Sequence, residues 1–307
     1  MSETGAPARE PIPIGAIAAP PFVRLPDPAT HFRLRAQRFA VLALDHDLAP
    51  YLRFMAGLGE AQHQTQNGLP GTVMPAWVDQ PRGRLHAMPP LNLISHTADA
   101  GLEATFDRFF ALAEEVDMPV AARAALDAVT RLDEARRAEL TQAVLEGSPA
   151  EACLAERTFV AAALQVYLAR LASGLDAKQL VPVSDGVCPA CGGAPAASLI
   201  VGWPGAHGAR FCACSLCSTL WHAVRIKCVS CGSTEGIGYE EVMEGPGAGQ
   251  VRAETCRMCK SYVKIMLQTE NAALDPVADD VATLGLDILM RETGICRAGA
   301  NPFLLGY

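Results

Sequence analysis

Cysteine residues in the C-terminal half of the chain form four Cys-x-x-Cys pairs. The pairs lie within 72 residues and use eight of the eleven cysteines: Cys188/Cys191, Cys214/Cys217, Cys228/Cys231 and Cys256/Cys259. Two thiolates at this spacing can bind a metal ion from a single tight turn, and two such turns complete a tetrahedral site of four sulfurs. The sequence therefore predicts two metal sites and leaves no paired cysteine over.

The spacing favours sequential pairing of the four turns. The gap inside the first two pairs is 22 residues, the gap inside the last two is 24, and only ten residues separate the second pair from the third. Gly192 and Gly232 each follow one turn, where glycine accepts a positive φ and lets N–H groups point toward the sulfurs. We therefore prefer two successive sites to an interleaved cross-brace: Cys188, Cys191, Cys214 and Cys217 in the first, and Cys228, Cys231, Cys256 and Cys259 in the second.

Metal explains the pairs better than disulfides or a redox-active dithiol. Structural disulfides need an oxidising compartment, and the N-terminal sequence has no basic start and prolines interrupt its apolar part, unlike a secretory signal. A redox-active Cys-x-x-Cys is usually single. Four thiolates in a tetrahedron suit zinc or a single iron ion, and spacing alone favours zinc because structural zinc is common.

Length and charge limit the function classes. The chain has 307 residues, half of them hydrophobic, and a net charge of −8, which fits a chain of more than one domain. No apolar run reaches the roughly 18–20 residues of a membrane span, so we expect a soluble, cytoplasmic protein. Between residues 186 and 271 basic residues exceed acidic ones by one, and two metal–thiolate sites would bring this region to about −3. Nucleic-acid binding is therefore disfavoured.

Helical periodicity dominates the first half of the chain. In the segment that begins near Ala29, Phe32, Ala36 and Phe39 share one face and arginines occupy the other. A second helix begins near Asp47, and residues 67–90 form a Gly- and Pro-rich connection. Further helices are predicted over 95–117, 119–131, 134–146 and 151–173.

The pattern changes to short strands in the cysteine-rich region. Strands are predicted at Ala197–Val201, Trp221–Ile226 and Ser261–Leu267, and one amphipathic helix after Asp275, with Val277, Val281, Leu284, Ile288 and Leu289 apolar. The predicted fold is multidomain: an all-α N-terminal array, two tandem zinc-ribbon-like small β metal units, and a C-terminal helix. The predicted boundaries are an extended arm at 1–28, a helical domain at 29–183, metal units at 184–225 and 226–271, and a C-terminal helix and tail at 272–307.

Several other residues have weaker signals. Cys212 is interpreted as a buried thiol, and Cys153 and Cys296 as core residues. Trp221 is predicted to be core between the metal units, whereas His222 and Arg225 could face a partner. Asp279 and Asp280 are adjacent on the C-terminal helix, so at most one is expected in a groove, and the other on a solvated face.

The cysteine region resembles the FdhE family of formate dehydrogenase accessory proteins. The resemblance rests on Cys188-Pro189-Ala190-Cys191-Gly192, on Cys214-Ser215-Leu216-Cys217, and on the run from Trp221-His222 to Cys228-Val229-Ser230-Cys231. It extends to Tyr262-Val263-Lys264-Ile265, Val277-Ala278-Asp279-Asp280, Asn301-Pro302-Phe303 and, in the helical part, Tyr51-Leu52-Arg53-Phe54. Cys212 and Leu220 depart from the family pattern without affecting a proposed ligand.

The resemblance implies a cytoplasmic factor that matures formate dehydrogenase and binds its catalytic subunit. It also implies two rubredoxin-like units, each holding an iron ion, for which zinc could substitute. On this view the protein is not an enzyme, because the chain has no persuasive nucleophile–base pair or phosphate loop. The alternatives are a rubredoxin-like redox protein that transfers electrons or senses oxygen, and a zinc-ribbon binding module. Self-association into a homo-oligomer is compatible with the sequence.

Overall fold

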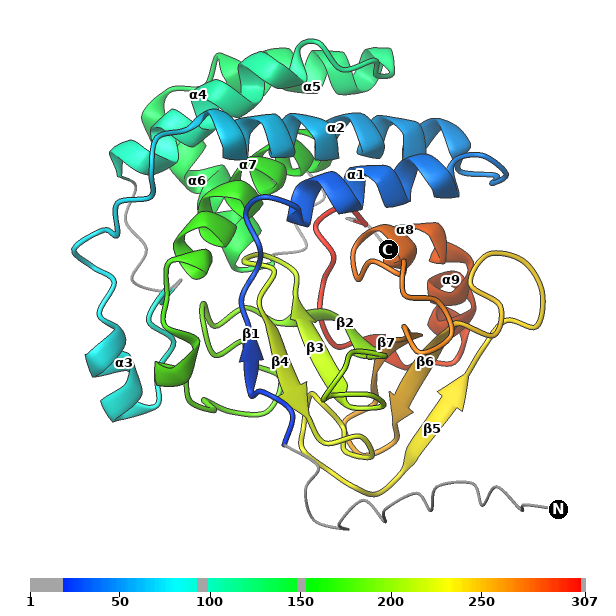
Figure 1. Cartoon of the computed structure of the whole chain (residues 1–307). Coiled ribbons are helices and arrows are strands. Elements are labelled where there is room, and N and C mark those ends of the chain that lie inside the picture. The colour runs from blue at the N-terminus through cyan, green and yellow to red at the C-terminus, as the bar shows by residue number, and fades with distance from the viewer. Residues whose placement is uncertain (1–18, 93–98, 148–152, 305–307) are drawn as a thin grey trace, which may run out of the picture.

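The protein places a layer of helices over one end of an antiparallel-rich sheet (Figure 1). The computed structural model describes residues 19–92, 99–147 and 153–304. The predicted fold class is confirmed: helices come first, and a small sheet region with two groups of four cysteines follows. Most of the predicted arm, residues 1–18, lies outside the described residues, but its end forms strand β1 (Val23–Arg24).

Helix α7 (Leu154–Ser173) is the centre of the helical layer. All of its residues from Phe159 to Ala172 are buried, including the polar Gln165 and Arg170, so the helix is packed on every side. It contacts four of the surrounding helices. The other helices of the layer are α1 (His31–Leu42), α2 (Ala49–Gly68), α3 (Gln80–His86), α4 (Ala100–Ala113), α5 (Val120–Thr130) and α6 (Glu134–Leu145), and a 3-10 turn, η2 (Ala177–Gln179), follows α7.

In helix α1 the predicted apolar face is buried, but one of the arginines predicted to face solvent is buried as well. Phe32, Ala36 and Phe39 are buried. Arg35, expected among the outward arginines, is only 1% exposed and donates to Gln165 Oε1 at 3.1 Å. The burial of Arg35 between α1 and α7 was not predicted, because its partner Gln165 lies far away in the sequence. The connection over 67–90 also contains a helix, α3, that was not predicted.

The strands form one sheet in the order β1-β4-β3-β2-β7-β6-β5, with β8 beside β7. Within each metal unit the strands pair antiparallel, and β1 adds to β4 in the same sense. The two units meet where β2 and β7 pair in parallel, with Ala197 opposite Lys264. The two units therefore share a sheet. The boundaries given for them from the sequence, 184–225 and 226–271, remain a prediction. The strands are β2 (Pro195–Ile200), β3 (Arg210–Cys214), β4 (Leu220–Ala223), β5 (Ile237–Glu240), β6 (Val251–Cys256), β7 (Ser261–Leu267) and β8 (Cys296–Arg297).

Strands β2, β4 and β7 match predictions, and β1, β3, β5, β6 and β8 were not predicted. Strand β4 ends at Ala223 instead of Ile226, because the chain turns toward the next pair of cysteines. Strand β6 was hidden by the charged residues Arg252 and Glu254 in its middle. Glu254 is nevertheless 3% exposed, which its sequence does not suggest.

The predicted C-terminal helix is divided into α8 (Ala278–Ala282) and α9 (Leu284–Glu292). The break at Thr283 turns the second half, so Ile288 and Leu289 are exposed while Leu286 and Met290 are buried. The predicted apolar face is therefore wrong for Ile288 and Leu289, whereas Leu284 packs against the core as predicted. None of the helices in the described residues is both long and apolar enough to cross a membrane.

Candidate metal centres

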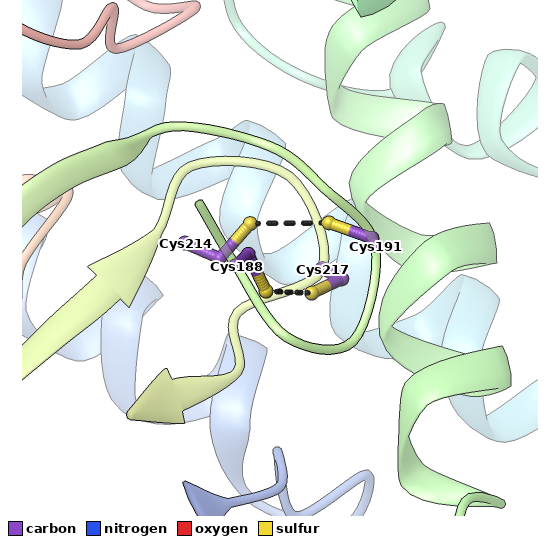
Figure 2. A group of neighbouring side chains, drawn as sticks. All are labelled: Cys188, Cys191, Cys214 and Cys217. Atoms are coloured by element: carbon purple, nitrogen blue, oxygen red, sulfur yellow. Dashed lines mark hydrogen bonds between the residues drawn. The ribbon is translucent and has the colours of Figure 1, made fainter. Parts of the chain in front are cut away.

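The eight paired cysteines form two compact groups of thiols. Within each group the four sulfurs lie within 4.8 Å of one another: Cys188, Cys191, Cys214 and Cys217 in the first site, and Cys228, Cys231, Cys256 and Cys259 in the second site. Figure 2 shows the first site, with Cys188 facing Cys217 at 3.6 Å and Cys191 facing Cys214 at 3.4 Å. The grouping is the sequential one preferred from the spacing.

The distances between sulfurs fit a tetrahedral metal site. A metal–sulfur bond of about 2.3 Å places two sulfurs of a tetrahedron about 3.8 Å apart. In the second site Cys228 and Cys259 are 3.7 Å apart, and Cys231 and Cys256 are 3.8 Å apart. These separations are far too long for disulfides, and all of these cysteines are free. Each group can thus bind a metal ion with four thiolates and no open position.

All four turns use the same backbone device. The residue after the second cysteine of each pair has a positive φ: +84° at Gly192, +60° at Ser218, +75° at Gly232 and +52° at Lys260. A positive φ was predicted at the glycines of two turns, and the structure shows that Ser218 and Lys260 adopt the same conformation in the other two. This bend directs N–H groups inward, and Gly193 N–H donates to Cys191 Sγ at 3.4 Å.

The first site is enclosed by the helical layer. None of its cysteines is more than 2% exposed, and they share one apolar core with α2, α4 and α7. Gln165 of α7 donates to the Ser215 carbonyl inside the second turn at 2.7 Å. Burial raises the pKa of Cys188 well above its usual value, whereas hydrogen bonds from the other thiols outweigh burial and hold the pKa of Cys214 well below it. A bound cation would offset the negative charge of four thiolates buried together.

The second site lies at the surface of the sheet. Cys228 and Cys256 are buried, but Cys259 is half-buried and Cys231 is exposed. Burial raises the pKa of Cys228 to about 12. Burial also opposes ionisation of Cys259, but hydrogen bonds from Ser261 and the other thiols lower its pKa to about 7. A thiolate is therefore available at this site near neutral pH, in contact with solvent.

A buried ion pair connects the two metal units. Arg210 of β3 donates to both carboxylate oxygens of Glu254 on β6, at 2.7 and 3.0 Å, and both side chains are almost inaccessible. The same guanidinium donates to the carbonyls of Arg225 and Lys227, directly before the first turn of the second site. This pair was missed from the sequence, because 44 residues separate its members and neither has a motif.

Comparison with known proteins assigns the chain to a family. The N-terminal domain of FdhE matches residues 20–185, the central domain 187–225 and the C-terminal domain 226–304. The chain belongs to the FdhE family. It is 44% identical over 299 residues to a protein named "Protein FdhE homolog" from Rhizobium meliloti (strain 1021), covering 97% of both chains. It is 36% identical over 294 residues to one from Pseudomonas putida, covering 93% of this chain and 90% of that one.

A solved FdhE structure has the same fold. The crystal structure of the FdhE protein from Pseudomonas aeruginosa superposes with a TM-score of 0.82 at 30% identity, covering 93% of this chain and 99% of the other. The FdhE central domain contains the first four cysteines and the C-terminal domain the second four, so the family division runs between the two sites.

The remaining sequence predictions have mixed outcomes. Cys212 is buried as predicted, with a pKa raised by burial to about 12, and Trp221 is buried. Cys153 and Cys296 are exposed, so the prediction that they fill the core is wrong. Cys153 precedes α7 in a left-handed conformation, and Cys296 lies on the short outer strand β8.

The adjacent aspartates are both buried, which contradicts the predicted solvated position for one of them. Asp279 accepts from Arg38 of α1, with a closest distance of 2.6 Å. Asp280 lies 3.1 Å from the buried ammonium of Lys264 and also pairs with Arg297. The break at Thr283 and the return of the chain through β8 bring these cations around α8, so both carboxylates are neutralised inside the protein.

Proposed function

We propose that this protein is an accessory factor in the maturation of formate dehydrogenase and binds the catalytic subunit of that enzyme. Membership of the FdhE family supports the accessory role, and the two groups of four thiols support a binding function in preference to catalysis. A metal held by four thiolates has no open position for substrate, so it cannot act as a Lewis acid. The protein would act in the cytoplasm, before the subunit is exported.

We further propose that the eight cysteines bind two iron ions, one in each site. Iron in such a site can exchange one electron, and zinc could take its place. The chain's own contribution is to hold four turns in fixed positions, through the left-handed residues after each pair and through Gln165 and Arg210. The observation that carries the proposal is that all eight thiols already lie in two tetrahedral-sized groups.

The test is complementation of a strain that lacks its own FdhE protein. Cys188→Ser and Cys256→Ser should abolish capture of the catalytic subunit and formate oxidation in that strain, and halve the iron per chain of anaerobically purified protein. Cys153→Ser and Cys296→Ser provide matched controls, because both cysteines lie outside the two groups and are exposed. Full complementation by a chain without the eight cysteines would refute the role of the metal sites.

The exposure of the second site favours one alternative, a redox protein. A surface iron–thiolate site can exchange electrons without a substrate pocket. Reversible bleaching of the iron–thiolate absorbance by a physiological reductant, with unchanged capture of the catalytic subunit, would favour the redox function. Capture that depends on the sites but not on their oxidation state would favour the accessory function.

A further inference from the structure

Three apolar side chains that flank the turns of the second site are exposed to solvent. Val224 and Ile226, just before the first turn, are 59% and 64% exposed, and Met258, inside the second turn, is 63% exposed. Large apolar side chains gathered at one place on a surface are a sign of an interaction site. At the first site the four cysteines and Leu216 are instead buried in the core that they share with the helical layer.

Cations lie among these apolar side chains. Arg225, Arg257 and Lys260 are exposed, and none of the three has an ion-pair partner among the described residues. The chain as a whole is acidic, with a net charge of −8. We call these six residues the second-site surface: Val224, Arg225, Ile226, Arg257, Met258 and Lys260.

A hollow continues from this surface toward the first metal unit. Its volume is about 480 Å³, and Val224 and Lys227 belong to its wall. Phe22, Trp221 and Val229 supply much of the remaining apolar wall, and half-buried His222 lies in it as well. A hollow of this size is able to accept a bulky side chain of a partner, and such anchors supply most of the binding energy of protein interfaces.

The surface is fixed before a partner arrives. The carbonyls of Arg225 and Lys227 accept hydrogen bonds from buried Arg210, at 3.3 and 3.2 Å, so the segment that carries Val224 and Ile226 is held from inside the sheet. A surface that is already ordered loses less conformational entropy on binding.

We propose that the second-site surface and this hollow bind an acidic segment of a partner protein, with one bulky apolar side chain in the hollow and carboxylates on the three cations. This inference rests on the proposed function, since the partner would be the catalytic subunit of formate dehydrogenase. A second copy of the chain fits poorly, because a two-fold contact would bring the same cations together.

The experiment measures binding of the purified catalytic subunit to the full-length, metal-loaded protein by biolayer interferometry. The triple change Arg225→Glu, Arg257→Glu and Lys260→Glu should weaken binding by at least about 100-fold, and high salt should weaken binding of the unaltered protein. The double change Ile226→Ser and Met258→Ser should weaken it by about 10-fold. Because Lys260 also supplies the left-handed backbone after the last cysteine pair, the double change Arg225→Glu and Arg257→Glu is tested beside the triple one. It should weaken binding by at least about 10-fold and leave metal per chain and helical circular dichroism unchanged.

Matched controls carry the same changes in the helical layer. Arg53, Arg82 and Arg131 are exposed, as are Leu44 and Val73, so charge reversal of the three arginines and serine at the two apolar positions should leave binding unchanged. Equal weakening by both triple variants would mean that only overall charge matters, and would overturn the inference.

The outcomes separate the inference from the function on which it rests. Failure of the unaltered protein to bind the subunit would overturn both. Binding that survives the triple change at the second-site surface would overturn the inference alone. Self-association, or binding of a labelled oligonucleotide, that disappears in the triple variant while subunit binding persists would assign the surface to another occupant and overturn the inference too.

Discussion

In a protein with Glu254 replaced by glutamine, the second site should lose its metal during unfolding before the helical layer unfolds. The change preserves the size of the side chain but leaves the Arg210 guanidinium, which is fully buried, without its only carboxylate partner among the described residues. Breaking a buried ion pair by removing one charge costs about 3–5 kcal/mol. Because Arg210 also holds the carbonyls of Arg225 and Lys227, the strain should appear first at Cys228.

The assay follows two signals during urea unfolding of the metal-loaded protein. One is helical circular dichroism, and the other is metal released to a chromophoric chelator. In the Glu254→Gln variant the release of one metal per chain should move to lower urea, corresponding to about 3–5 kcal/mol, and precede loss of the helical signal. Replacing Arg210 with methionine in the same variant should restore part of the lost stability, because no unpaired charge is then buried. The restoration should be incomplete, because the carbonyls of Arg225 and Lys227 lose their donor.

A matched pair on the same sheet provides the control. Arg252 and Glu241 form an ion pair at 2.6 Å with side chains that are 40% and 36% exposed, so Glu241→Gln should cost no more than about 1 kcal/mol. The reasoning is refuted if Glu254→Gln costs no more than this control, or if both metals leave together with the helical signal.

Three further outcomes are expected. Burial, followed by the positive charge of Arg35, lowers the pKa of His31 from 6.5 to about 3, so the unfolded chain binds a proton below pH 6.5 that the folded protein does not. Stability should therefore fall as pH drops from 7 to 5, by at most about 2 kcal/mol, and denaturant titrations of His31→Gln should show a smaller fall. Ser218 has a left-handed backbone and a buried hydroxyl with no hydrogen bond among the described residues, so Ser218→Gly should stabilise the protein by about 0.5–1 kcal/mol in the same titrations; destabilisation would contradict this. Exposure of Cys231 should let a chelator remove the second metal at least about tenfold faster than the first, as measured by stopped-flow absorbance, and equal rates would count against the difference in burial.

The sequence predicted the cysteine groups because each turn is local. Two sulfurs three positions apart must lie together, and the ten residues between the second and third pairs are too few to form another unit. The helices were predictable for the same reason. The apolar face of α1 depends only on neighbours within a few positions.

The features that escaped prediction depend on partners distant in the chain. The burial of Arg35 requires Gln165, 130 positions later, and the carboxylate of Asp275. The burial of Asp279 requires Arg38. Charged residues inside β6 conceal a strand unless the partner of Glu254 is known. The difference between the two metal sites was also invisible, because exposure depends on which unit the helical layer covers.

The parallel pair of β2 and β7 has a consequence for the order in which the chain assembles. Apart from β1, which joins β4 from far earlier in the chain, each half of the sheet forms from consecutive strands. Strands β2 and β7 lie at the centre of the sheet, so they can pair only after both halves exist. Until then each half presents an open edge formed by a largely buried strand. Open edges of this kind promote aggregation during synthesis. A nascent or truncated chain that ends after the first unit therefore keeps β2 as an unpaired edge strand until β7 pairs with it.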